Sequence, residues 1–255
     1  MRTGSSLTWY GWLLCAWTLI TPFQYGFHIS IFNQLHNVLT CDHPGASSTA
    51  APGYHLPTCI PMNDFTFSAV TAIYTIGGFF GSVVANVIMD KWGRKGATRV
   101  SAASVVLGTG IMAGSSTVFP MGLGRLFVGL GAGLGLCVGP IYLSELAPEK
   151  IKGSVGEFHD YPQQTRAHKL QGVLLQLATV LGIFFTQLLG LNLATPSHWR
   201  YVIIFSLGLG CLQFILAPFA TDTPVWLKRK GRKEESDQAS ARVWGAAMLR
   251  RDDGE

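Results

Sequence analysis

The sequence predicts an all-α membrane protein with six transmembrane helices, and three observations carry that prediction. Only 13% of the residues are charged, against about 25% in ordinary globular proteins. Mean hydropathy is positive at +0.31, so a soluble domain of this composition would lack the polar side chains that cover a surface. Positive charges also gather in alternate connections between the apolar stretches, as they do in membrane proteins.

Six stretches of the 255-residue chain approach the roughly 20 apolar residues that a helix needs to cross a bilayer. The second and third contain no Lys, Arg, Asp or Glu. The weaker ones are rich in Gly, Ser and Thr, which membrane helices tolerate. In chain order the stretches are Trp12–Phe32, Phe67–Met89, Val100–Val118, Met121–Leu143, Val173–Leu191 and Tyr201–Phe219.

The distribution of charge predicts the topology. Of the 19 Lys and Arg residues, 17 fall on one side of the predicted membrane, and that side is cytoplasmic by the positive-inside rule. The predicted organisation is a cytoplasmic N-terminus at 1–11, a transmembrane bundle at 12–219 and a cytoplasmic tail at 220–255. The bundle has an outer loop at 33–64, which contains no Lys or Arg, and a polar insertion at 157–172.

The first apolar stretch allows a second interpretation. Arg2 followed by an apolar run also suits a cleaved signal peptide. The run of about 20 residues is long for a signal peptide, and no convincing cleavage site follows it. A retained first helix is therefore the favoured interpretation.

Two cysteines, Cys41 and Cys59, lie in the predicted outer loop. An extracytoplasmic loop permits a disulfide between them, and two free thiols are the alternative. The other three cysteines fall within predicted spans, where thiols serve as packing residues.

Glycines recur at four-residue spacing in the fourth predicted span, at Gly131, Gly135 and Gly139. Such a ridge of small residues predicts close helix packing. No dinucleotide-binding spacing is satisfied, and the sequence shows no nucleophile triad, metal cluster or phosphate loop. We therefore expect no enzyme activity, no metal, no cofactor and no nucleic-acid partner.

Three motifs occur in order on the predicted cytoplasmic side. The sequence DKWGRK follows the second span at Asp90–Lys95, and Gly124–Gly153 contains GR at its start and SELAPEKIKG at its end. TDTPVWL follows the sixth span at Thr221–Leu227. Together they resemble the motifs of the sugar porter family of the major facilitator superfamily, and the resemblance covers residues 12 to about 235.

The resemblance implies the N-terminal half-bundle of a twelve-helix major facilitator fold, with the beginning of a cytoplasmic helical domain as its tail. It implies transport of a hexose or related polyol by alternating access, and it is nearest to the fungal branch. Gln187 and Gln176 match glutamines of the fifth helix, and the family's outer one hydrogen-bonds sugar hydroxyls. An amide suits this role because it both donates and accepts, and the alternative for Gln187 is a hydrogen bond that joins neighbouring helices.

Charged residues are implied at two levels of the bundle. Arg125 and His28 fall at similar depth in the outer half, and His28 occupies the position of an acid associated with the proton in proton-coupled members. His28 is also a candidate substrate-binding residue, with Gln176 and Gln187. A packed structural role is the alternative for both. On the inner face we expect a charge cluster that stabilises one transporter state, formed by Asp90, Arg94, Lys95, Glu145 and Lys152.

The chain departs from the family pattern in three places. His28 replaces the acid, which favours facilitated diffusion over proton symport. Asp222, Thr223 and Val225 stand where the family has Glu, Ser and Arg. The insertion at 157–172 separates two motifs that nearly adjoin in the family. It is either a genuine loop or the translation of a retained intron.

Two hypotheses follow for function. The first is a sugar-porter-type transporter in the bilayer, with the plasma membrane favoured over a vacuolar or endosomal membrane. Because only one half is present, it would work with a C-terminal half or as a homodimer. The second is a truncated, transport-inactive membrane protein that assembles with another transporter.

Overall fold

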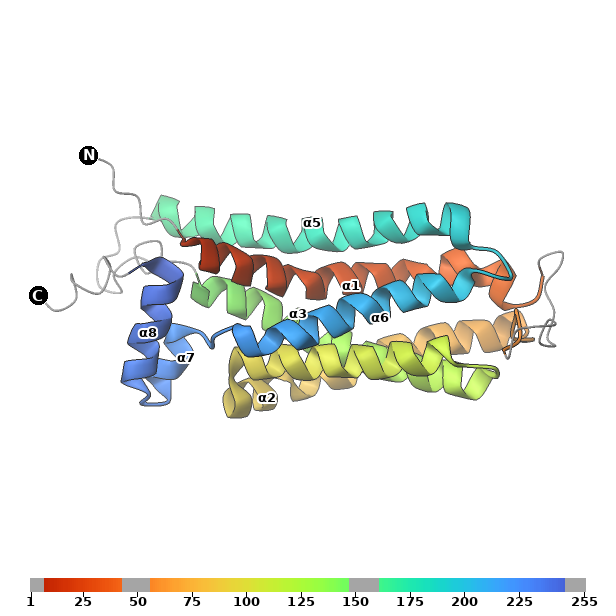
Figure 1. Ribbon diagram of the computed structural model, residues 1–255, viewed down its shortest axis with the longest axis horizontal. Coiled ribbons are helices and arrows are strands. Elements are labelled where there is room, and N and C mark those ends of the chain that lie inside the picture. Colours follow the sequence, from red (N-terminus) through yellow and green to blue (C-terminus); the bar gives the residue numbers. More distant parts are fainter. Residues whose placement is uncertain (1–6, 43–55, 147–160, 246–255) are drawn as a thin grey trace, which may run out of the picture.

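The computed structural model describes residues 7–42, 56–146 and 161–245, and within these ranges it contains helices and no strand. Long helices lie side by side along one axis, and two short ones sit at one end (Figure 1). The long helices are α1 (Trp9–Leu39), α2 (Asp64–Ala113), α3 (Val118–Leu146), α5 (Tyr161–Leu193) and α6 (Trp199–Leu216). After α6 come the 3₁₀ turn η1 (Ala217–Phe219), α7 (Pro224–Arg229) and α8 (Lys233–Trp244).

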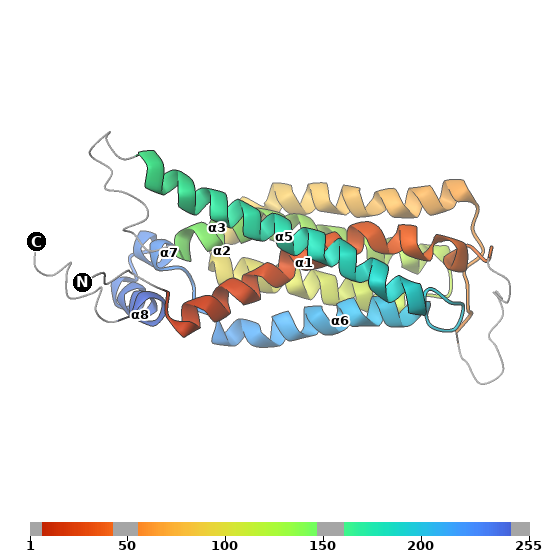
Figure 2. The ribbon, with the colours of Figure 1, turned by 90° about the horizontal axis from the view of Figure 1, so that it is seen from above.

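Helix α2 contains both the second and the third predicted span. Gly93 interrupts it with φ 77°, in the left-handed region that favours glycine. The chain turns back there, so that two arms run in opposite directions (Figures 1 and 2). The predicted connection between the two spans is therefore a sharp break at Gly93. A Cβ atom at this position would also collide with the carboxylate of Asp222.

Helix ends differ from the predicted spans because hydrogen-bonded caps set them. Helix α1 begins after Thr8, whose side chain accepts a hydrogen bond from the Gly11 N–H, and it continues to Leu39. Helix α2 begins after Asn63, whose side chain accepts from the Thr66 N–H. Residues 161–172 of the insertion continue α5 as helix, while 157–160 lie outside the described residues.

Among the described residues, four segments are long and apolar enough to cross a membrane: α2, α3, the part of α5 from Gly172 to Leu193, and α6 with η1 to Phe219. Large apolar side chains face outward from them. Phe65 is 82% exposed, Val87 68% and Phe79 63%. Such a surface is stable when lipid covers it, whereas in water it would be an extensive exposed apolar patch.

The first helix, α1, is not among these four segments, because polar residues lie on the face that it buries. These polar groups form a seam with α6. The Trp17 indole N–H donates to the Gln213 carbonyl oxygen at 2.9 Å, and the Gln213 amide donates to Thr21 Oγ1 at 2.7 Å. Further along, the Gln24 amide donates to the Ser206 carbonyl oxygen at 3.3 Å. Helix α1 therefore places these polar side chains against α6, inside the bundle.

Glycines bring α2 and α3 into backbone contact. A Cβ atom at Gly81 would collide with the Leu130 carbonyl oxygen, and one at Gly133 would collide with the Gly78 carbonyl oxygen. Lipid provides no hydrophobic drive for helix association, so membrane helices rely on such close contacts.

The predicted glycine ridge of α3 packs closely at two of its three positions. Gly131 faces the Ser101 carbonyl oxygen and Gly135 faces the Thr21 side chain, and neither has room for a Cβ atom. Gly139 has only an ordinary contact, 3.5 Å from a leucine methyl. The packing prediction is confirmed at the first two positions.

The close contact at Gly133 makes a stability prediction with a matched control. Gly133→Ala places a methyl group against the Gly78 backbone and should destabilise the fold by about 1–3 kcal/mol. Gly110→Ala in α2 has open space and should be neutral or stabilising by up to ~1 kcal/mol. Thermal unfolding of the detergent-purified proteins measures both. Equal midpoints for the two variants would contradict the role of close packing at Gly133.

Candidate functional site

The half of the bundle away from α8 holds a buried cation. Arg125 projects from α3 and is 1% exposed. Its guanidinium carbon lies 4.1 Å from the ring centre of Phe32 and 4.6 Å from that of Tyr74. Its Nη1 donates to the His28 carbonyl oxygen at 3.0 Å. In the described part of the chain Arg125 forms no ion pair, so two aromatic faces and a carbonyl dipole stabilise its charge.

The structure brings His28 and Arg125 together through the His28 backbone. The imidazole Nε2 of His28 instead shares a 2.7 Å hydrogen bond with Ser206 Oγ on α6. His28 Nδ1, Arg125 Nε and the Tyr74 hydroxyl are buried without hydrogen-bond partners in the described residues. This centre, formed by His28, Arg125, Ser206, Phe32 and Tyr74, therefore keeps unused hydrogen-bonding capacity.

The two glutamines of α5 lie apart from this centre. Gln176 and Gln187 are both exposed, and their spacing of about three helical turns puts them on one face, roughly 16 Å apart. Between them the buried side of α5 is held by Thr186, whose hydroxyl donates to the Phe27 carbonyl oxygen at 3.2 Å. The exposed face of α5 can therefore offer two amides to a ligand.

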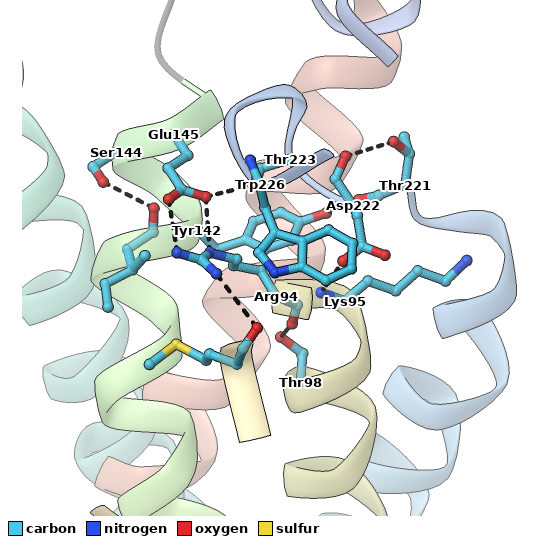
Figure 3. A network of polar contacts seen from close by, with 12 residues as sticks. Arg94, Lys95, Thr98, Tyr142, Ser144, Glu145, Thr221, Asp222, Thr223 and Trp226 are labelled. Atoms are coloured by element: carbon cyan, nitrogen blue, oxygen red, sulfur yellow. Dashed lines mark hydrogen bonds and ion pairs between the residues drawn. The ribbon is translucent and has the colours of Figure 1, made fainter. Parts of the chain in front are cut away.

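A charge network joins α2, α3 and the segment before α7 at the α8 end of the bundle. Arg94 Nη2 donates to Glu145 Oε1 at 2.9 Å, and Arg94 Nε lies 2.9 Å from Glu145 Oε2. The Thr223 hydroxyl donates to Oε2 of the same carboxylate. Figure 3 shows the three side chains converging from their separate elements. All three are buried, so Glu145 is the shared acceptor that compensates the Arg94 charge.

A second contact lies beside this network. The Asp222 carboxylate accepts a hydrogen bond from the Lys95 backbone N–H at 3.0 Å, immediately after the break at Gly93 (Figure 3). Burial raises the pKa of Asp222, and this hydrogen bond partly offsets the increase. The Lys95 ammonium donates to the Pro218 carbonyl oxygen at 3.1 Å. The two contacts fix the chain after α6 against the start of the second arm of α2.

The remaining predicted residues lie outside these networks. Asp90 is exposed and has no ion pair within the described ranges. Lys152 lies outside the described residues. Cys41 and Cys59 form a disulfide at the opposite end of the bundle, next to the connection between α1 and α2.

Sequence reasoning missed several partners in these networks. Ser206, Phe32 and Tyr74 carry no motif that separates them from ordinary helix residues. Thr223 had a recognisable signal, because Thr before Pro is a favourable start for a helix. The structure uses it that way, since the Thr223 hydroxyl also accepts from the Trp226 N–H.

Comparison with known proteins places the chain in a family. A family model described as "Sugar (and other) transporter" matches residues 14–253. The chain is 28% identical over 228 residues to the "Probable plastidic glucose transporter 1" of Arabidopsis thaliana. That alignment covers 89% of this chain and 38% of the relative. It is 35% identical over 178 residues to the "Probable quinate permease" of Aspergillus flavus. That alignment covers 68% of this chain and 31% of the permease.

Among solved structures, the chain resembles the partially occluded, inward-open xylose transporter XylE from E. coli. The TM-score is 0.66 at 17% identity, over 95% of this chain and 57% of that one. The chain spans less than half the length of the curated relatives that it matches. The match over 14–253 and the shared fold identify this chain as a member of the sugar (and other) transporter family and an integral membrane protein.

Proposed function

We propose that this chain acts as the N-terminal six-helix half of a sugar transporter and that it moves a hexose or a related polyol by alternating access. The six crossings would be α1, the two arms of α2, α3, α5 and α6. The observation that carries the proposal is the pair of glutamines on the exposed face of α5, in a chain of this family.

The exposed face of α5 suits a polyhydroxylated substrate. Gln176 and Gln187 each offer a donor and an acceptor, and within the described residues their exposed side chains are open to a ligand. Transporters of this type bind substrate near the bilayer midplane, between two halves. The relatives' names include glucose and quinate, both of which are hydroxylated rings. The second half would be a C-terminal half or a second copy of this chain.

We propose that the contacts among Arg94, Glu145 and Thr223 stabilise one conformational state of the transporter. It joins three elements at the α8 end, and its opening would separate α3 from α7. The charge distribution supports a cytoplasmic position for this end and for both termini. We favour the plasma membrane as the location.

The alternative proposal is a transport-inactive membrane protein that assembles with another transporter. It is supported by His28 in place of the family's acid. Normal insertion of the chain with no hexose uptake in transporter-deficient cells would favour this alternative.

Substitution of Gln187 tests the substrate face. Loss of one net hydrogen bond of about 0.5–1.5 kcal/mol should raise the half-saturation concentration for labelled hexose about 2- to 10-fold in Gln187→Ala. Val180→Ala, seven residues before Gln187 on the same exposed face of α5, removes no hydrogen-bonding group and is the control. Uptake by cells that lack their own hexose transporters measures both. Equal half-saturation for the two variants would contradict the assignment.

Substitution of Glu145 tests the charge network. Glu145→Gln leaves Arg94 buried without a counter-charge and should lower the free energy of unfolding by about 3–5 kcal/mol. The control is Asp90→Asn, an exposed carboxylate near Arg94 in sequence, with an expected change within about 0.5 kcal/mol. The double variant Arg94→Gln, Glu145→Gln should recover part of the loss. Thermal unfolding midpoints measure all three, and a double variant no better than Glu145→Gln contradicts the pairing.

Substitution of His28 tests the link to proton coupling. His28→Asp places a carboxyl group, which can bind and release a proton, beside the Arg125 cation. Uptake by this variant should rise as the external solution is acidified, while wild-type uptake should respond less. Hexose uptake across the acidic to neutral range measures the difference. A flat profile in a variant that inserts normally would count against a coupling role for this position.

A further inference from the structure

A cavity of about 460 Å³ lies at the α8 end of the bundle, beside the contacts that Lys95 makes with Asp222 and Pro218. Its walls come from the start of the second arm of α2, the chain from Pro218 to Asp222, and α8. Five charged side chains line it: Lys95, Asp222, Arg232, Glu235 and Arg242. The volume falls within the range of small-molecule sites, about 300–1,000 Å³.

The charges in this cavity are not balanced. Arg232 is already paired with Glu235 through two hydrogen bonds of 2.7 and 2.6 Å. Asp222 is held by the Lys95 backbone N–H. The Lys95 ammonium and the Arg242 guanidinium form no ion pair among the residues that the structure describes. The lining therefore carries a net positive charge, with Lys95 on α2 near the Asp222 carboxylate and Arg242 on α8 outside ion-pair distance of any carboxylate in the described residues.

The cavity also lies at the boundary of the apolar bundle. It begins where the apolar segment Trp199–Phe219 ends, and Phe219 lines it while being 74% exposed. The groups that a bilayer presents at this level are phosphate headgroups, which attract basic side chains by about 1 kcal/mol for each Lys or Arg near the surface. Two converging cations also suit a phosphate oxyanion better than a neutral sugar.

We propose that this cavity binds a phosphate ester anion between Lys95 and Arg242. The anion is either the headgroup of an anionic lipid or a soluble phosphate ester. Because Lys95 belongs to α2 and Arg242 to α8, the bound anion would tie α8 to the membrane bundle. The site is separate from the glutamine face of α5, so its occupation does not depend on the proposed transport function.

The test measures binding to the full chain purified in uncharged detergent. The probes are short-chain phosphatidylinositol 4-phosphate, inositol 1,4-bisphosphate and inorganic phosphate. Wild type should bind at least one probe saturably. Lys95→Gln, Arg242→Gln should weaken that binding at least about tenfold, from the loss of two charges. Gln238→Glu, which adds a carboxylate to the cavity wall without removing any contact, should also weaken it.

The matched control is Lys228→Gln, Arg229→Gln, which removes two exposed charges that do not line the cavity. Its affinity should stay within about twofold of wild type. Binding of the lipid probe without the soluble ones assigns the bilayer as the source, and equal binding of inositol bisphosphate assigns a soluble ester. Equal weakening in the control and the cavity variants, or no saturable binding of any probe, overturns the proposal.

Discussion

Close backbone contact between helices is the constraint on which the rest of this structure depends. Where Gly81 and Gly133 meet carbonyl oxygens of the facing helix, no side chain can stand between the two backbones. Dispersion attraction between the backbones at that distance replaces the hydrophobic drive that a bilayer does not supply. With α2 and α3 fixed in this way, the Arg94 guanidinium and the Glu145 carboxylate are held within hydrogen-bond distance. The charge network therefore depends on packing that occurs well away from it.

The two arginines that are buried in the described residues have different surroundings. Arg94 has a carboxylate, whereas Arg125 has two aromatic rings and a carbonyl oxygen. A carboxylate pair can be broken and re-formed as helices move apart, which suits a gate. Two aromatic rings stay beside the Arg125 cation even when its hydrogen bond breaks, which suits a position that does not move. Under the proposed function, this difference would place the moving contacts at the α8 end and the rigid ones around Arg125.

Much of the fold followed from the sequence, because length, hydropathy and charge are properties of whole segments. The membrane class and the family could be predicted from them, and the comparisons confirm both. Individual side-chain contacts could not be predicted from the sequence. Position along the predicted spans placed His28 and Arg125 at one level, but it could not tell that the backbone of His28 would make the contact. Asp90 shares a motif with Arg94 yet is exposed, because helix rotation, which no motif specifies, decides which side chain turns inward.

The polar seam of α1 has a consequence for the order of assembly. Thr21, Gln24 and His28 find their partners on α6, more than 170 residues later in the chain. During synthesis, α1 emerges long before α6 exists, and its hydropathy is below that of the other long apolar segments. Until α6 arrives, these side chains have no partner in lipid. Helix α1 is thus made well before the helix that accepts and donates these hydrogen bonds, and the polar seam forms only once α6 has been inserted beside it.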